Sequence, residues 1–474
     1  ECASEEVCPG GINQCGPGYM GLACGKCKEN FYRDEDLCRQ CEDADEEYFY
    51  TLVTVAVVVL ILVIVALGAL VKYIPYALYG TMGITIFFFQ MIGLFRQIEL
   101  EWPSSMQWTL DAFSFFVINL SIFRAECAVG SFDHWHRSVI VLAIPVSLLV
   151  LVSGLKWVRV ALCSSDDMDE VRKTTGQVAV ITTTVGFAFV AQQIISLVDC
   201  RWQPAPKVYT LSSEPTQVCF SDPVWLSAYL PLLILAVVVY LSSIITINKA
   251  VSNNRDSLRN MNSLTFKSVQ GWYYKYRRSQ PFWETWMLLD KFAIVLTITL
   301  LSRWPTRTCL TLLVILSAMF LHQWLKKPFA CEENNLLMQI TTGSLLFVII
   351  TSSLLYTPIP DRNKHQIGPL TTFVKEAFGY INCILIFGCA ALILFFCYYL
   401  SKAFHFERQR KKRPHRRTLA HSFSLFNEEC LDKLASHHPE VVSGLIVEHR
   451  WMGTNNEAAD NREYITMFTS FVRQ

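Results

Sequence analysis

The first 41 residues contain cysteines whose spacing suits two kinds of chemistry. Cys24, Cys27, Cys38 and Cys41 form two C-x-x-C pairs separated by ten residues, in CGKCKENFYRDEDLCRQC. Four thiolates at nearly this spacing are typical of a zinc ribbon in a reducing compartment. Paired cysteines among Gly, Tyr and acidic residues are also typical of a disulfide-bonded extracellular module. The side of a membrane on which the segment lies decides between these interpretations.

The composition indicates a polytopic membrane protein. Of the 474 residues, 52% are hydrophobic and 17% are charged, and the apolar runs are long and unbroken. These features exclude an ordinary soluble globular protein. The net charge of +1 is uninformative as a total, because the orientation of a membrane protein depends on where its Lys and Arg residues fall.

Seven cysteines precede the first apolar run, and an odd number leaves one of them without a partner in this segment. They are Cys2, Cys8, Cys15, Cys24, Cys27, Cys38 and Cys41. No cleavable signal peptide opens the sequence. We therefore expect the segment to be the membrane-proximal end of a longer chain.

Nine apolar stretches, each about 20 residues long, predict transmembrane helices. They are Thr51–Val71, Ala77–Phe95, Ser138–Leu155, Gly176–Val198, Val224–Ile247, Thr285–Ser302, Cys309–Leu325, Leu336–Tyr356 and Phe378–Leu400. Met106–Ala125 is more polar, with Asp111 and Asn119, and is predicted to be an interfacial or re-entrant helix. The expected fold class is an all-α polytopic membrane bundle with a small disulfide-rich extracellular module.

The cations cluster in alternate predicted loops, which predicts an orientation. The loops on one side hold Lys72, Lys156, Arg159, Arg172, Lys173, Lys326, Lys327 and seven further cations from Lys249 to Arg278. The acidic run Glu42–Glu47 (EDADEE) precedes the first apolar stretch. By the positive-inside rule, we expect a plasma-membrane protein whose N-terminus is outside and whose C-terminus is cytoplasmic. The opening cysteines then face an oxidising space, which favours disulfides over zinc.

Three regions follow from this orientation. Residues 1–47 are predicted to be a cysteine-rich, EGF-like extracellular module, residues 48–400 a transmembrane bundle with an interfacial segment at 106–125, and residues 401–474 a cytoplasmic tail. The tail begins with a basic stretch that should attract anionic inner-leaflet lipids, on the order of 1 kcal/mol per cation. Its cations are Arg408, Arg410, Lys411, Lys412, Arg413, Arg416 and Arg417.

Cysteines beyond the opening segment predict one further bridge. Cys200 and Cys219 bracket a predicted outer loop, so we expect a disulfide that closes it. Cys127 is also predicted to lie outside, and the spacing leaves its partner open.

The sequence contains no known catalytic constellation. A P-loop, an H-E-x-x-H motif, a nucleophile elbow and a kinase signature are all missing, so we expect neither an enzyme nor a bound cofactor, nor a nucleic-acid partner. The run FDHWHR, with His134 and His136, suits a metal or a pH sensor, but an ordinary polar loop explains it better.

Polar residues within apolar stretches are costly in a membrane and are therefore functional candidates. Gln90 is expected to make interhelical hydrogen bonds. Glu284, Asp290 and Lys291 open a predicted span, and the carboxylates can pair with the preceding cationic loop WYYKYRR. This pattern favours a fixed elbow, with gating as the alternative.

Several short stretches together resemble a known layout of large multi-pass surface proteins. GPGYMGLACGKCKENFYR…LCRQC resembles the ephrin-receptor-like or EGF-like cysteine repeats that end the ectodomains of such proteins in protists, algae and oomycetes. Their membrane half is similar to the TRP-like fold, and its motif order resembles Gln90, Trp102, Pro103, Glu126, Cys127, Pro145, Trp283, Glu284, Lys327 and Pro328, with Asn334 and Asn335 following. Apicomplexan cysteine-repeat modular proteins are similar in layout, which implies a role at the parasite surface in triggering secretory-organelle discharge.

The leading functional hypothesis is a receptor or sensor that couples the outer cysteine module to cytosolic signalling or secretion. Its expected partners are the bilayer, extracellular proteins and cytosolic adaptors, in an oligomer or a hetero-complex. A TRP-like cation channel is one alternative, although the outer loop RWPTRT is basic where a cation pore would carry acidic rings. A membrane tether for a large extracellular assembly is the other alternative.

Overall fold

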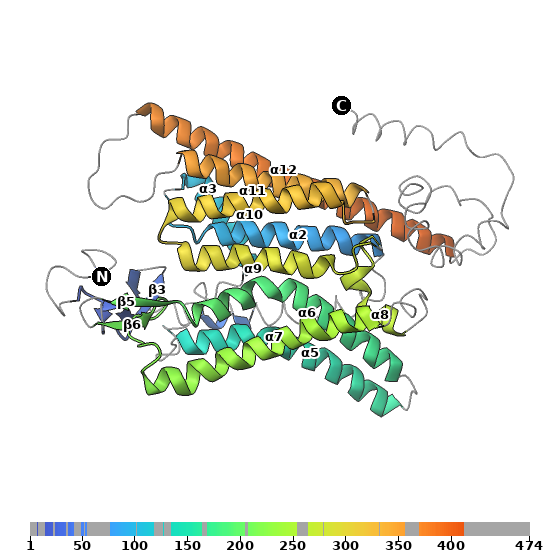
Figure 1. Ribbon diagram of the computed structural model, residues 1–474, viewed down its shortest axis with the longest axis horizontal. Coiled ribbons are helices and arrows are strands. Elements are labelled where there is room, and N and C mark those ends of the chain that lie inside the picture. The colour runs from blue at the N-terminus through green and yellow to red at the C-terminus, as the bar shows by residue number, and fades with distance from the viewer. Residues whose placement is uncertain are drawn as a thin grey trace.

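The computed structural model of the chain is a helical bundle with small β-hairpins at one end (Figure 1). It describes residues 7, 15–21, 24–34, 37–41, 49–51, 53–54, 76–100, 102–117, 127, 134–163, 168–203, 207–253, 264–277, 279–330, 332–355 and 369–411. Its helices are α2 (Tyr76–Phe95), α3 (Ser104–Ser114), η2 (Phe115–Val117), α5 (His134–Cys163), α6 (Met168–Ser196), η4 (Trp225–Tyr229), α7 (Leu230–Asn253), α8 (Leu264–Tyr273), α9 (Trp283–Leu301), α10 (Pro305–Lys326), α11 (Glu332–Leu355) and α12 (Pro369–Lys411). Its strands are β1 (Tyr19–Met20), β2 (Lys26–Cys27), β3 (Phe31–Asp34), β4 (Leu37–Gln40), β5 (Cys200–Gln203) and β6 (Val208–Leu211).

Six of the described helices are long and apolar enough to cross a membrane. They are His134–Leu155, Val171–Ser196, Trp225–Asn253, Pro305–Lys326, Glu332–Leu354 and Val374–Phe395. They coincide with six of the nine stretches predicted from the sequence, so a helical bundle of membrane character is confirmed, whereas nine crossings are not.

The remaining three predicted stretches differ from this group for separate reasons. The stretch predicted at 77–95 is the helix α2, whose apolar described part, Gly80–Phe95, is shorter than a full span. The stretch predicted at 285–302 is the helix α9, which differs from the six by its three ionisable residues, Glu284, Asp290 and Lys291. Most of the stretch predicted at 51–71 lies outside the described residues.

The long helices pack in two groups, one with α2 and the other with α6 as its central element. In Figure 1, α2, α9, α10, α11 and α12 form one group, and α5, α6, α7 and α8 form the other. Contacts of α6 with α9 and with α2 join the two groups. Phe87, Phe88, Met91 and Leu94 of α2 are fully buried, so this helix forms the centre of the main apolar core.

The two ends of the bundle carry different structures. The strands β1 to β6 lie at one end, here called the module end, and α8 lies at the other, here called the α8 end (Figure 1). The strands pair as three antiparallel hairpins, β1 with β2, β3 with β4 and β5 with β6. Short hairpins are marginal alone, so these depend on disulfides and on packing against the bundle.

Two elements depart from the boundaries expected from the sequence. The segment predicted as interfacial, 106–125, is helical from Ser104 to Val117, and its residues 118–126 lie outside the description. Met106, Leu110 and Phe113 are buried, because α3 packs against α2 and α12. The helix α12 continues to Lys411, beyond the predicted start of the tail, since no helix breaker occurs before Pro414.

Candidate functional site

Two chain segments that are distant in sequence pair side by side at the α8 end. Residues 275–277 follow α8, and residues 327–330 connect α10 to α11. Tyr276 and Phe329 form an antiparallel bridge. The amide of Arg277 donates to the carbonyl of Pro328 at 2.8 Å, and the amide of Ala330 donates to the carbonyl of Lys275 at 3.1 Å. The predicted elbow beside Glu284 is therefore held by backbone hydrogen bonds.

The Glu284 carboxylate lies at the centre of this corner. Its Oε2 is 2.7 Å from Lys275 Nζ and accepts a hydrogen bond from the Tyr276 hydroxyl at 2.6 Å. The side chains of Lys275 and Glu284 are each only 7% exposed. The predicted pairing of Glu284 with the cationic loop is confirmed, and the partner is Lys275.

Tyr276 is held neutral by its surroundings. Burial, and after it the charge and the hydrogen bond of Glu284, raise the pKa of the Tyr276 phenol well above its usual range. The residue lies between α8 and α9, outside the candidate spanning helices. Its phenyl ring packs against Phe329, with ring centroids 5.0 Å apart.

A second ion pair lies in the same corner and is more exposed than the first. Arg277 Nη2 is 2.6 Å from Glu332 Oε1, at the start of α11, and Arg277 Nε donates to the carbonyl of Phe329 at 3.3 Å. Glu332 also suits a helix N-terminus, where a carboxylate interacts favourably with the helix dipole. We call Lys275, Tyr276, Arg277, Glu284 and Glu332 the α8-end network.

The sequence KPF and its following asparagines build the turn on which this network rests. Lys327 ends α10 in the left-handed conformation, with φ of 41°. The side-chain oxygen of Asn335 accepts from the amide of Phe329 at 2.9 Å, and its nitrogen donates to the carbonyl of Phe329 at 3.0 Å. Lys327 and Pro328 therefore shape the chain, while Asn335 fixes the turn.

Small residues of α2 allow this corner to approach the bundle core. A Cβ atom at Gly80 would lie 2.4 Å from Asn334 Nδ2, and one at Gly83 would lie 3.3 Å from Lys275 Nζ. Thr81 Oγ1 donates to Asn334 Oδ1 at 3.0 Å. The corner thus contacts α2 directly.

A further cation lies deeper between the helices. Lys291 Nζ is 3.2 Å from the carbonyl of Thr184 and 3.4 Å from Gln90 Oε1. Gln90 also donates through Nε2 to the carbonyl of Val185 at 2.7 Å, which confirms the predicted interhelical role of Gln90. Lys291 is only 4% exposed. This group, the Lys291 site, joins α2, α6 and α9.

The other motif positions fall into packing contacts at separate places. Trp283 is buried and its ring lies 4.6 Å from that of His322. Trp102 donates through Nε1 to the carbonyl of Ile98, and Pro103 lies against Gly379 of α12. Pro145 lies beside Gly186 of α6. Glu126 lies outside the described residues.

The five described cysteines of the opening segment form disulfides. Cys15 pairs with Cys24, and Cys27 pairs with Cys38. The partner left open for Cys127 is Cys41, which is 86 residues away in sequence. All four cysteines of the C-x-x-C pairs are therefore oxidised, so the zinc-ribbon alternative is wrong. Cys2 and Cys8 lie outside the described residues.

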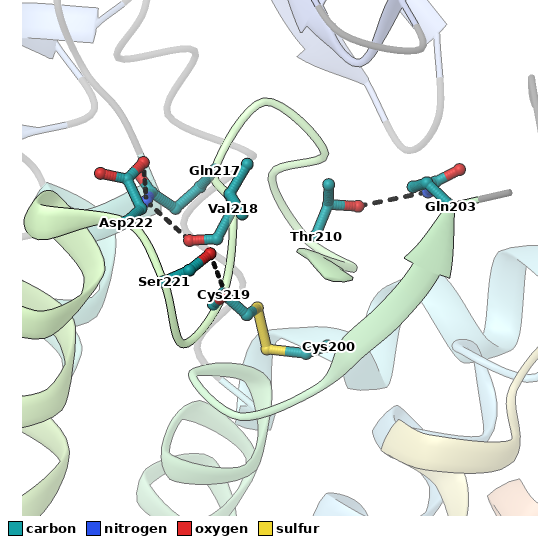
Figure 2. Close-up of a disulfide and its surroundings, with 8 residues drawn as sticks. All are labelled: Cys200, Gln203, Thr210, Gln217, Val218, Cys219, Ser221 and Asp222. Atoms are coloured by element: carbon teal, nitrogen blue, oxygen red, sulfur yellow. Dashed lines mark hydrogen bonds between the residues drawn. A yellow bond between two sulfur atoms is a disulfide. The ribbon is translucent and has the colours of Figure 1, made fainter. Parts of the chain in front are cut away.

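The predicted Cys200–Cys219 bridge is also present, at the base of the hairpin β5–β6. Figure 2 shows the hydrogen bonds within this hairpin and in the loop that follows β6. Gln217 Nε2 donates to Asp222 Oδ2 at 3.0 Å, and Gln203 Nε2 donates to Thr210 Oγ1 across the hairpin at 3.2 Å. The module packs on this loop, because a Cβ atom at Gly25 would lie 2.5 Å from Pro215.

The basic stretch and the histidine run belong to other parts of the chain, as far as they are described. Arg408, Arg410 and Lys411 belong to the end of α12, and Lys412, Arg413, Arg416 and Arg417 lie outside the description. His134 and His136 open α5. Within the described part of the chain, no group of three His, Cys, Asp or Glu residues could hold a metal ion.

The α8-end network and the disulfides have the arrangement expected of structural contacts that couple helices to one another. In the α8-end network, the carboxylates of Glu284 and Glu332 are each paired with a cation. The Lys291 ammonium is instead bound by neutral oxygens. Lys275 and Arg277 belong to the cationic loop that the sequence singled out, whereas Glu332 and the α6 carbonyls carried no sequence signal. No protein-family model, curated protein or solved structure matches this chain.

Proposed function

We propose that the chain is a cell-surface receptor or sensor, in which engagement of the cysteine-rich module outside the cell changes the helix packing at the cytoplasmic α8 end. In this proposal the chain crosses the plasma membrane nine times, and its basic tail contacts anionic lipid and cytosolic partners. The layout similarity to multi-pass surface proteins of protists supports the same function.

The Cys41–Cys127 disulfide is the observation that carries the proposal. It ties the module covalently to the chain between η2 and α5. The contact of Gly25 with Pro215 gives the module a second attachment, on the loop between α6 and α7. A module attached at two places transmits displacement to the bundle better than one on a flexible linker.

A set of contacts leads from α3 and η2, the described elements that precede Cys127 in the chain, to the α8 end. The elements α3 and η2, which precede Cys127, pack against α2. Near its N-terminus, α2 contacts the α8 end, through Thr81 with Asn334 and through Gly83 with Lys275. Further along the same helix, Gln90 binds Lys291. A set of contacts of this kind is a route for coupling, and a coupling measurement is what tests it.

Hydrogen exchange of the full-length protein in lipid nanodiscs tests the proposal. An antibody fragment raised against the module serves as the engaging probe. We expect its binding to change amide exchange at residues 275–284 and 327–332, more than 200 residues away from the module in sequence. The change should disappear when Cys41→Ser and Cys127→Ser are combined, and should persist in Cys397→Ser, which alters a free cysteine of α12.

Two results would contradict the receptor. Unchanged exchange at the α8 end in the wild-type protein with the antibody fragment bound would favour the tether. Reproducible single-channel currents from the purified protein in a planar bilayer would favour the TRP-like channel.

A further inference from the structure

A row of four aromatic rings extends from the hairpin β5–β6 to the first turn of the following helix. Trp202 and Tyr209 are register partners, with ring centroids 5.1 Å apart. Tyr209 lies 6.2 Å from Phe220, and Phe220 lies 5.0 Å from Trp225. We call these four residues the aromatic row.

The outer three rings of the aromatic row are open to the surroundings of the protein. Trp202 is 52% exposed, Tyr209 48% and Phe220 55%, whereas Trp225 is 4% exposed. Isolated exposed apolar residues are common, but a continuous row of large rings marks an interaction surface.

The hairpin that carries the row has two faces of different character. Side chains alternate along a strand, so Trp202 and Tyr209 share their face with Cys200 and Leu211, of which Leu211 is fully buried in the helical core. The opposite face carries polar residues, where Gln203 donates to Thr210. The aromatic face is therefore an outward continuation of the apolar core.

The aromatic row also continues into the exposed apolar side of a candidate membrane span. Val224 and Leu226 flank Trp225 and are exposed. The same span, Trp225–Asn253, exposes a longer series of large aliphatic side chains. They are Ile234, Leu235, Val238, Leu241 and Ile245. Acyl chains would cover such a surface in a membrane, and the row lies at the module end of this surface.

We propose that Trp202, Tyr209 and Phe220 insert into the headgroup and upper acyl region of the leaflet at the module end. Trp and Tyr favour this region because their rings are apolar and their N–H and O–H groups reach water. The hairpin thus anchors to lipid the loop on which the module sits, through Pro215 and Thr216. The position of the module would then follow the surface of the leaflet.

Residue-resolved footprinting of the wild-type protein in phosphatidylcholine–phosphatidylglycerol nanodiscs tests this inference. Hydroxyl radicals report access to water, and a diazirine dissolved in the lipid reports access to acyl chains. Met20, exposed in the module, is the water-facing control, and Leu241 is the lipid-facing control. We expect the three rings to be oxidised several-fold less than Met20 and to be labelled by the diazirine as Leu241 is.

The opposite pattern would overturn the inference. Oxidation of the three rings to the level of Met20, without diazirine labelling, would show that the row is open to water and suits an extracellular protein partner. As a second measurement, Trp202→Ser with Phe220→Ser should reduce diazirine labelling of residues 200–220 several-fold, whereas Trp202→Phe should retain it. The inference requires the bilayer but no signalling, so its failure would leave the receptor proposal standing.

Discussion

Glu284 is the residue on which the α8-end network depends most, because its carboxylate both neutralises the Lys275 ammonium and accepts the hydrogen bond of Tyr276. Glu284→Gln leaves the buried Lys275 ammonium without its ion pair, and breaking a buried pair from one side costs about 3–5 kcal/mol. We expect a loss of this size in the free energy of unfolding, measured by denaturant titration in detergent micelles. Replacing both partners, Lys275→Met with Glu284→Met, should recover most of it, because no uncompensated charge stays buried.

The pair between Arg96 and Asp111 is the matched control for this variant. Its atoms are 2.6 Å apart, against 2.7 Å in the pair of Lys275 with Glu284, but its side chains are 31% and 58% exposed. Exposed pairs contribute roughly 0–1 kcal/mol, so Asp111→Asn should have a small effect. Equal losses for Asp111→Asn and Glu284→Gln would contradict the assignment of the α8-end network as a buried, stabilising cluster.

Tyr276 predicts a dependence of stability on alkaline pH. Its pKa is raised in the folded protein, so its contribution is complete below the pKa of an unfolded Tyr, about 10, and is lost as pH rises from there towards the folded pKa. At pH 8, Tyr276→Phe should be less stable than the wild type by about 1.5–3 kcal/mol, because a hydrogen bond to a charged acceptor is lost.

Above pH 10 the difference between the two proteins should shrink. The wild type loses about 1.4 kcal/mol per pH unit from this one group, and the Phe variant does not. Free energies of unfolding at pH 8, 10 and 11 measure the effect. A difference that stays constant over this range would show that the Tyr276 phenol does not keep its proton in the folded protein.

At the residue scale, the sequence predicted which residues need a partner better than it predicted the partner of each one. The cost of a carboxylate beside an apolar stretch indicated that Glu284 needs a cation, and the adjacent loop supplied several. The choice of Lys275 among them depends on tertiary contacts, including the space left by Gly83. In the same way, cysteine spacing carries no information on connectivity, so the Cys41–Cys127 pair could not be predicted.

At the element scale, the close approach of α2 and α3 depends on one glycine. A Cβ atom at Gly93 would lie 2.6 Å from the carbonyl oxygen of Phe113, which is a backbone atom and cannot rotate away. Gly93→Ala must therefore separate the two helices, and overpacking of this kind typically costs about 1–3 kcal/mol. The same unfolding measurement should show this loss.

Gly388 in α12 provides the comparison for Gly93. Nothing lies within 4 Å of the position that its Cβ atom would occupy. Gly388→Ala should be neutral or stabilising by up to about 1 kcal/mol, because Ala favours a helix more than Gly does. If Gly93→Ala were as stable as Gly388→Ala, the tight packing of α3 on α2 would be wrong.

The length of an apolar run predicted a helix well where no other property of the sequence was needed to specify it. Six stretches matched because a continuous apolar run of this length has few alternatives to a helix. The segment at 106–125 was harder, because Met106, Leu110 and Phe113 lie on one face of a polar-looking helix and are buried by tertiary packing alone. The continuation of α12 to Lys411 also depends on helix propensity, which hydropathy does not measure.

At the scale of the whole molecule, the number of membrane crossings decides the position of the two termini. Cys41 lies at the module end, whereas Gly80, near the start of α2, contacts Phe329 at the α8 end. The chain therefore changes ends between these points. The six candidate spans among the described helices would, alone, leave both termini on one side of a membrane, and only an odd number of crossings places them on opposite sides.

Epitope tags before Glu1 and after Gln474 measure this directly in cells that express residues 1–474. Because cations concentrate at the α8 end and in the tail, at about 1 kcal/mol each near an anionic leaflet, we expect the first tag to bind antibody on intact cells. The second tag should bind only after permeabilisation. Staining of both tags on intact cells would require an even number of crossings and would contradict the nine-span bundle. Staining of the second tag alone would reverse the orientation, place the disulfides in a reducing compartment and remove the basis of the receptor proposal.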